Sequence, residues 1–270
     1  MRSDERGLEL SVPAAFYDAC GPTSFRASPA TVGPWHSGLQ HGGPPAALLG
    51  RTLERQGGPP GSRIARIAFD FFGPVPVGDV SVQADVVRRG ERIQLSAATM
   101  EGGGRTVMRA HAWHLRAEPG RSPVASADFV VPPLPSRETT ALFAGVERFG
   151  YGDALEWRFV TGGFDELGPA TVWSRCRHPL VAGEPLTGVE RTLVMVDAAN
   201  GTSAVLPITT WTFVPVELTV VAERWPDTEW VGMSSTTTIG ADGIGATQTR
   251  LFDERGAFGH ALQTLFVTPR

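Results

Sequence analysis

At 270 residues the chain is long enough to form one large domain or two small ones, with a core that needs no disulfide or metal. Its formal net charge is −4 and it carries no block of basic residues, which argues against nucleic acid as a partner. All 24 basic residues are arginine, so chemistry that requires lysine, such as a Schiff base, a pyridoxal phosphate anchor or a phosphate-loop lysine, is excluded.

The cysteine content and the N-terminus indicate the compartment. Cys20 and Cys176 are too few for a disulfide framework and fit a reducing environment. Residues 1–6 lead into no apolar segment, so we expect no signal peptide. No run of apolar residues reaches the roughly 18 needed to span a bilayer. We therefore expect a soluble, cytoplasmic protein without a membrane partner.

The first half of the chain predicts one helix and four strands. Residues 44–56 begin with two prolines, place Leu49 and Leu53 four apart, and stop at Gly57, which is typical of a helix. The first two turns are apolar nearly all round, so this end of the helix should be buried. Four runs rich in β-branched and aromatic residues follow at 64–72, 80–87, 93–100 and 106–115.

The second half repeats this order after a break. Residues 119–140 are rich in proline and predict a stiff linker between units at 1–118 and 141–270. A second apolar helix is expected within residues 191–206, starting at Asp197, although Asn200-Gly201 would also suit a tight turn. Strands are expected at 154–160, 170–177, 211–223, 229–239, 246–252 and 257–267. A duplicated helix-plus-sheet unit is an α+β arrangement, and we expect a pocket between the halves.

Asp197 is the first candidate for chemistry. It could be an ordinary helix N-cap, which stabilises a helix by about 1 kcal/mol. Its setting favours a further role, because residues 193–196 before it are all apolar. A carboxylate near the core is desolvated, its pKa rises, and it becomes a plausible general base.

Two other polar elements accompany Asp197. Gln263 is a neutral amide in an otherwise apolar strand; it could face solvent, or it could hold a water or a carbonyl with its donors and acceptor. His41, Gly42 and Gly43 precede the first helix, where glycines let a ligand approach backbone N–H groups. A glycine turn needed only for tight helix entry explains that motif equally well.

Several other sequence patterns do not indicate a functional site. His111 and His114 are three apart, so on one strand they point to opposite faces and make a poor metal pair. No Gly-x-Ser-x-Gly nucleophile motif is present, which argues against an α/β-hydrolase. The glycines of residues 240–245 lie between two strands and indicate a turn, not a dinucleotide site. We expect neither a metal nor a redox cofactor.

These residues resemble the double-hotdog acyl-CoA thioesterases, from about residue 24 to the end of the chain. The resemblance lies in the order and spacing of several stretches: Trp35 with residues 40–49, which begin Gln40-His41-Gly42-Gly43; residues 173–180; residues 196–201, from Val196-Asp197 to Asn200-Gly201; Trp230-Val231; residues 253–256; and Gln263. It implies two tandem hotdog units, each a central helix wrapped by an antiparallel sheet.

The resemblance also implies a reaction and its residues. Type II thioesterases use an aspartate, a threonine or serine, and a glutamine around an attacking water, and the aspartate and glutamine correspond to Asp197 and Gln263. The hydroxyl position falls at about Pro215, which has no hydroxyl; Thr212 is nearby on the same stretch. Hydrolysis of an acyl-CoA or acyl-carrier thioester is expected, with an oxyanion held near Gly42 and Gly43, and coenzyme A present only as part of the substrate.

Two alternatives remain open at this stage. A hydratase or dehydratase of the hotdog fold would share the architecture, but the resemblance implies a histidine five residues after the aspartate, where Thr202 stands. A non-catalytic protein that binds acyl thioesters is favoured by Pro215. Family analogy also predicts a homodimer.

Overall fold

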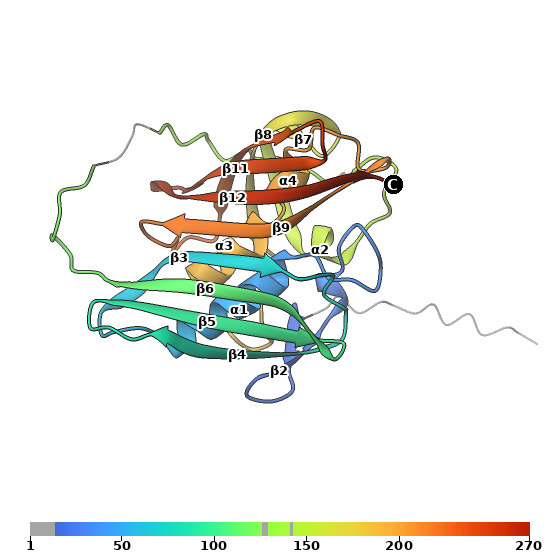
Figure 1. The fold of residues 1–270 in the computed structure, drawn as a ribbon. Coiled ribbons are helices and arrows are strands. Elements are labelled where there is room, and N and C mark those ends of the chain that lie inside the picture. The colour runs from blue at the N-terminus through green and yellow to red at the C-terminus, as the bar shows by residue number, and fades with distance from the viewer. Residues whose placement is uncertain (1–13, 126–128, 141–142) are drawn as a thin grey trace, which may run out of the picture.

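The computed structural model describes residues 14–125, 129–140 and 143–270. Within these residues the strands form one twelve-stranded sheet, and every pairing between named strands is antiparallel. The strand order is β1-β2-β4-β5-β6-β3-β9-β12-β11-β10-β8-β7, so β3 and β9 join the two halves of the chain at the centre of the sheet. Both long helices lie on the same side of the sheet, behind its strands in Figure 1.

The strand boundaries follow the expected alternation of apolar and polar residues. The first half contributes β1 (Tyr17–Ala19), β2 (Ser24–Ala27), β3 (Ser62–Phe71), β4 (Asp79–Arg88), β5 (Ile93–Gly102) and β6 (Arg105–Arg116). The second half contributes β7 (Leu155–Gly163), β8 (Glu166–Cys176), β9 (Trp211–Ala222), β10 (Val231–Ile239), β11 (Ile244–Asp253) and β12 (Gly256–Pro269). All ten predicted strands are confirmed. Four short elements were not predicted: β1, β2, the 3₁₀ helix η1 (Pro29–Thr31) and α2 (Gly150–Asp153).

The first predicted helix is confirmed as α1 (Gly43–Gln56), and its first two turns are buried as expected. The predicted start of the second helix is wrong. Helix α3 (Gly188–Val196) begins nine residues earlier than Asp197, since Thr187 and Glu190 form a capping box that satisfies the first N–H groups. Asp197 is therefore the residue that ends α3, and a separate short turn, α4 (Ala199–Thr202), follows it.

Helices α1 and α3 pack antiparallel, with glycine at the contact. A Cβ atom on Gly43 would lie 2.1 Å from the carbonyl oxygen of Val194, and one on Gly50 would lie 2.3 Å from the Leu193 side chain. The absence of a side chain at these two positions lets the helix backbones approach closely. As a result, the N-terminus of α1 meets the C-terminus of α3.

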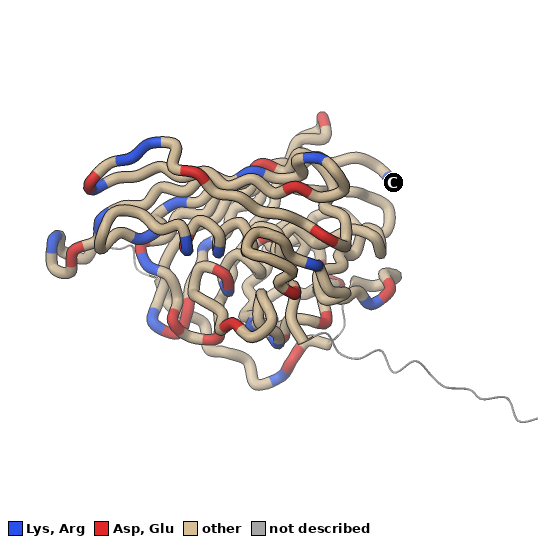
Figure 2. Tube along the Cα trace, turned by 90° about the horizontal axis from the view of Figure 1, so that it is seen from below, with Lys and Arg blue, Asp and Glu red and all other residues tan. Residues whose placement is uncertain are grey.

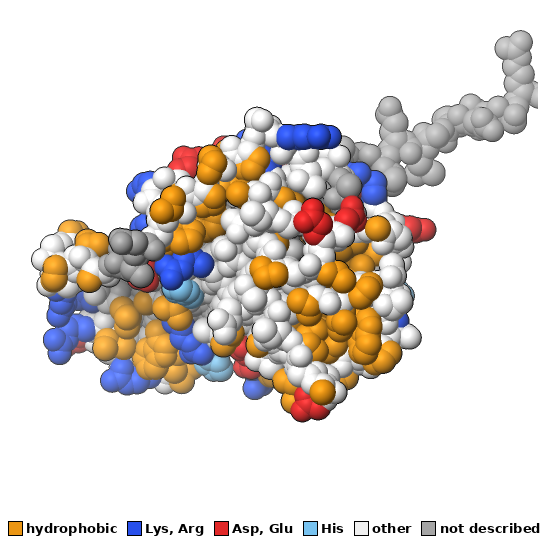
Figure 3. All heavy atoms as spheres, turned by 90° about the horizontal axis from the view of Figure 1, so that it is seen from above, with side chains coloured by type: hydrophobic (Ala, Val, Ile, Leu, Met, Phe, Trp, Pro, Cys, Tyr) orange, Lys and Arg blue, Asp and Glu red, His pale blue; other side chains and the backbone are white. Residues whose placement is uncertain are grey.

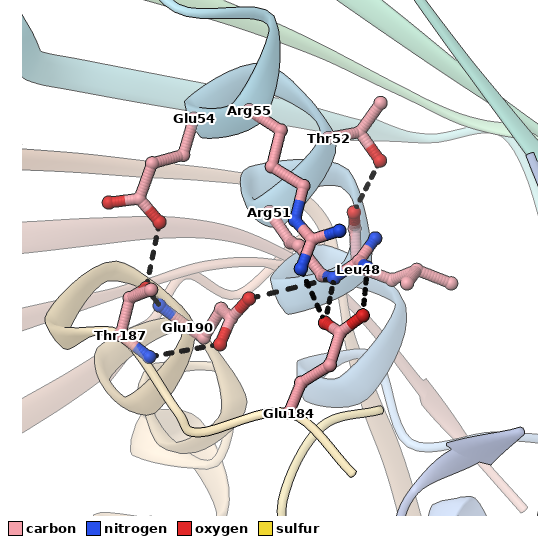
Figure 4. A network of polar contacts seen from close by, with 8 residues as sticks. All are labelled: Leu48, Arg51, Thr52, Glu54, Arg55, Glu184, Thr187 and Glu190. Carbon is pink, nitrogen blue, oxygen red and sulfur yellow. Dashed lines mark hydrogen bonds and ion pairs between the residues drawn. The ribbon is translucent and has the colours of Figure 1, made fainter. Parts of the chain in front are cut away.

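At the other end of this helix pair, a buried ion network ties the two halves together (Figure 4). The Arg51 guanidinium donates two hydrogen bonds to the Glu184 carboxylate, at 2.8 and 2.7 Å. Arg55 donates to the same carboxylate, and the Thr187 hydroxyl donates to Glu54 at 2.8 Å. Because Arg51 is only 6% exposed, its charge depends for compensation on Glu184 and on Glu190, whose carboxylate lies 3.8 Å away.

The proline-rich segment packs against the outer face of the second half. Its apolar side chains Phe129, Val131 and Leu134 cover a small cluster formed by Trp173, Trp230 and Phe252. The Trp173 indole N–H donates to the Pro132 carbonyl at 3.3 Å, and Arg158 donates to the Pro135 carbonyl at 2.8 Å. The linker is thus held to the sheet by its own contacts. The predicted boundaries at residues 118 and 140 stay predictions.

The surface carries both signs of charge. In the view from below, acidic and basic residues are scattered among one another over the trace (Figure 2). Seen from above, hydrophobic side chains gather in patches between charged groups (Figure 3). Among the residues that the structure describes, no helix is long and apolar enough to cross a membrane.

Candidate active site

A cavity of about 550 Å³ lies at the junction of the two halves. The first half lines it with residues 33–36, 39–42 and 71–75, and the second half with residues around α2, α4 and the start of β9. The prediction of a pocket between the halves is confirmed. Its lining includes Asp197, His41, Gly42 and Thr212, whereas Gly43 and Gln263 lie behind this wall.

Asp197 is buried at the end of α3, where it faces the start of α1. Its side chain is 3% exposed, and it accepts hydrogen bonds from the Gly42 backbone N–H and from Gln263. Burial raises the pKa of Asp197 to about 7, although these two hydrogen bonds act in the opposite direction. Near neutral pH a substantial fraction of this carboxyl is therefore ionised and able to accept a proton.

Gln263 faces the helices, so the solvent-facing alternative is wrong. It is 1% exposed and lies on β12 in line with Ala261, Leu265 and Val267, which are also buried. Its Nε2 donates to the Asp197 backbone carbonyl at 3.1 Å and approaches carboxylate Oδ1 at 3.5 Å. The alternation along β12 is a sequence pattern that could have placed this amide on the inner face.

The side-chain carbonyl oxygen of Gln263, Oε1, has no hydrogen-bond partner among the described residues. This oxygen is buried. Exchanging the two amide atoms would set Oε1 against the Asp197 carbonyl, so the contact at 3.1 Å fixes the orientation. A buried unpaired acceptor of this kind is typical of a site that holds a water.

His41 provides a neutral imidazole beside the carboxylate. Its Nδ1 accepts the Gly43 backbone N–H at 3.1 Å, and it lies 3.3 Å from Asp197 Oδ2. Burial lowers the pKa of His41 to about 3, so this contact is not an ion pair at neutral pH. Since Nδ1 is an acceptor, the ring proton is on Nε2. His41 lines the cavity, which makes this N–H available there.

The two residues after His41 must be glycine, because a side chain at either position would clash with its neighbours. A Cβ atom on Gly42 would lie 2.6 Å from Asp197 Oδ2, and Gly43 approaches Val194 as described. The N–H of Gly42 is taken by the Asp197 carboxylate, and the N–H of Gly43 is taken by His41. Both N–H groups thus have an acceptor within the protein in this arrangement, and the oxyanion role expected near Gly42 and Gly43 stays a prediction.

Two cavity residues were missed by sequence reasoning. Tyr151 of α2 stacks on His41, with ring centroids 3.6 Å apart and planes 3° apart, and its hydroxyl donates to the Val194 carbonyl at 2.9 Å. Asn200 of α4 is 6% exposed and donates from Nδ2 to the Phe213 carbonyl at 3.0 Å. Asn200 follows Asp197 by three residues, which one helical turn would bring to the same side.

The predicted hydroxyl region lies on β9. Thr212 and Pro215 both line the cavity, and among the described residues Thr212 makes no hydrogen bond to Asp197 or Gln263. Pro215 is tolerated in this central strand because the pairing with β3 ends at Glu217 and a bulge falls at Val216.

The two histidines of β6 do not form a metal site. His114 is 2% exposed, with a pKa lowered by burial, whereas His111 is partly exposed. Among the described residues, no group of three or more His, Cys, Asp or Glu side chains is arranged to hold a metal ion.

Comparisons with known proteins identify the family. Residues 31–115 match the model of the acyl-CoA thioesterase N-terminal domain, and residues 127–267 match that of the acyl-CoA thioesterase C-terminal domain. No curated protein sequence matches the chain.

Solved structures agree in fold over nearly the whole chain. A hot dog fold protein from Alicyclobacillus acidocaldarius has a TM-score of 0.71 at 17% identity, covering 93% of this chain and 95% of that one. A protein assigned as thioesterase II from Thermobifida fusca has a TM-score of 0.72 at 16% identity, covering 94% and 96%.

The acyl-CoA thioesterase II TesB2 from Mycobacterium marinum has a TM-score of 0.66 at 14% identity, covering 94% of this chain and 95% of that one. At such identities the likeness establishes the fold, here a double hotdog, while the domain matches establish the family. The chain belongs to the acyl-CoA thioesterase family and is a thioesterase of the double-hotdog fold.

Proposed function

We propose that the protein hydrolyses an acyl-CoA or acyl-carrier thioester with a water activated by Asp197. The observation that carries this proposal is a carboxyl group with a pKa of about 7 on the wall of the cavity between the two halves. A base whose pKa lies near the working pH combines a useful ionised fraction with adequate basicity.

The proposed reaction proceeds in two steps. Asp197 takes a proton from water as the water oxygen attacks the thioester carbonyl carbon. The resulting tetrahedral intermediate then collapses, the carbon–sulfur bond breaks, and protonated Asp197 returns the proton to the departing thiolate. The products are the free acid and the thiol.

Three neighbours support this chemistry. Gln263 holds Asp197 through Nε2, and its unpaired Oε1 fits a water that bridges to the carboxylate. Asn200 presents a second amide at the cavity wall, where it can substitute for the hydroxyl missing at Pro215. The Nε2–H of His41 replaces the backbone N–H groups as the donor to the substrate carbonyl, because those groups are already engaged.

Thiol release from acyl-CoA substrates tests the proposal. The Asp197→Asn variant keeps the size of the side chain and removes the base, so release should slow by about 10²- to 10⁴-fold. Asp79→Asn, at an exposed carboxylate paired with Arg26, is the matched control and should retain activity. Undiminished release in Asp197→Asn would remove Asp197 from the mechanism, and absence of release in the wild type would exclude hydrolysis of the thioesters tested.

A further inference from the structure

The cavity has an open side and a closed side. Among its lining residues, Phe72 is 51% exposed and Val216 is 44% exposed, and with the exposed His36, Pro74 and Arg270 they mark its open side. Phe143, Phe149 and Trp157 also line it, but they are buried, with exposed fractions of 9% or less. A substrate arm can therefore leave past Phe72 and Val216, while its other end must fit against the buried wall.

The closed side is built from aromatic rings set at steep angles to one another. The Phe164 ring lies 4.9 Å from Phe143 at 65° and 5.4 Å from Trp157 at 83°. Trp157 in turn lies 6.3 Å from Tyr151 at 62°. Such a wall offers ring edges and ring faces together, which are the surfaces that another aromatic ring contacts most favourably.

Phe164 is held in place by the turn that carries it. It lies between β7 and β8, where Gly162 has a φ of +73° and would be crowded by any side chain. The neighbouring Asp165 carboxylate accepts the Ala144 N–H at 3.0 Å, which ties this turn to the segment that carries Phe143. The Phe164 ring is partly buried, and its contacts with Phe143 and Trp157 make it part of this wall.

The aromatic wall starts at the reacting centre. Tyr151 stacks on His41, and His41 lies 3.3 Å from Asp197, so the rings extend from the carboxylate toward Trp157 and Phe164. A thioester carbonyl placed for attack beside Asp197 has its thiol arm toward the open side and its acyl group among these rings.

We infer that the acyl group carries an aromatic ring, an inference that rests on the proposed thioester hydrolysis. A ring in this space makes edge-to-face contacts that an alkyl chain of equal size lacks, and one or two such contacts correspond to roughly tenfold in binding. A long unbranched chain lacks these ring contacts and is disfavoured on that ground.

A matched pair of substrates tests this inference. Phenylacetyl-CoA and octanoyl-CoA have the same number of acyl carbons and differ in the ring. We expect kcat/KM to be roughly tenfold higher for phenylacetyl-CoA than for octanoyl-CoA. Equal or higher kcat/KM for octanoyl-CoA would overturn the inference and leave the proposed hydrolysis intact.

Failure of the proposed hydrolysis gives a different result. If no thioester releases thiol, calorimetric titration of phenylacetyl-CoA and octanoyl-CoA still compares their Kd values. Tighter binding of the phenylacetyl thioester would support the aromatic acyl site in a protein without turnover. Equal Kd values, or tighter binding of octanoyl-CoA, would contradict it.

Variants locate the selectivity at Phe164. Phe164→Leu removes the ring but keeps an apolar side chain, so the ratio of phenylacetyl to octanoyl kcat/KM should fall toward one. Phe266→Leu makes the same change at a 55% exposed position on β12, outside the cavity lining, and should keep the wild-type ratio. An unchanged ratio in Phe164→Leu would contradict the assigned role of Phe164.

Discussion

Carboxylate oxygen Oδ2 of Asp197 lies 3.3 Å from Nδ1 of His41. The two side chains do not form an ion pair at neutral pH, because His41 is uncharged there. Nδ1 accepts the Gly43 N–H, so it carries no proton that it could donate to the carboxylate. Burial moves the two pKa values apart, to about 7 for Asp197 and about 3 for His41. The pair therefore combines a proton acceptor with a neutral N–H donor, an assignment that fits general-base hydrolysis.

The pH dependence of kcat/KM follows from this pair. Protonated Asp197 cannot take a proton from water, so kcat/KM should fall about tenfold per pH unit below an ionisation near pH 7 and level off above it. His41 should add no second ionisation in this range, because its pKa is about 3. Initial rates of thiol release from about pH 5 to pH 9 measure the profile. A constant rate across this range would contradict Asp197 as the base.

The ionisation of buried Asp197 should also lower the free energy of unfolding at high pH. Its pKa rises from 3.8 to about 7 on folding, so between these values the folded state binds more protons than the unfolded state. The free energy of unfolding must then fall as the pH rises through this window, by up to about 4 kcal/mol.

Asp197→Asn cannot ionise and should escape this loss. Its melting temperature should exceed that of the wild type at about pH 8, and the difference should shrink or vanish at about pH 4. Thermal unfolding followed by circular dichroism at the two pH values gives the comparison. A variant less stable than the wild type at about pH 8 would show that the ionised carboxylate is stabilised by its hydrogen bonds more than burial destabilises it.

Removal of the Gln263 amide should change the ionisation of Asp197. The hydrogen bond from Gln263 lowers the pKa of Asp197, so Gln263→Leu should shift the ionisation in the pH profile upward and reduce kcat. A purely structural role would lower stability without moving this ionisation. Thr264→Val, at an exposed neighbour on β12, should leave the profile unchanged.

The His41→Phe variant separates the N–H donor from the aromatic stack. Phenylalanine can still stack on Tyr151 but donates no hydrogen bond, so kcat should fall by roughly 10²- to 10³-fold, the usual effect of losing one oxyanion donor. The melting temperature should fall as well, because the Gly43 N–H loses its acceptor. His260→Phe, at an exposed site on β12, is the control. Activity retained in His41→Phe would rule out His41 as the carbonyl donor.

Local patterns were sufficient for the ten longer strands and for α1. The alternation of apolar residues and the proline and glycine at the ends of residues 44–56 act over a few neighbouring residues, so they can be recognised without the fold. The start of α3 could also have been found, because Thr187 and Glu190 form a capping box in sequence. The short β1 and β2 have too few residues to show a period.

The candidate site was predicted in part. Asp197, Gln263 and the His41-Gly42-Gly43 motif were singled out by residue type and by resemblance, and the fold brings them together at one end of the α1–α3 pair. The hydrogen-bond partners of the two glycine N–H groups could not be inferred from the sequence. The Gly42 N–H donates to Asp197, which is far away in the chain, and the Gly43 N–H donates to His41 only because of the geometry of the turn.

By itself, the sequence determined the composition of the two units, the order of their elements and the polar residues available for catalysis, since these depend on local residue patterns. The tertiary structure alone decided that Asp197 is buried enough to have a pKa of about 7, and that Tyr151 and Phe164 extend an aromatic wall from it. Burial and ring contacts arise between segments far apart in the chain. The spacing of residues along the sequence does not give the distance between such segments in space.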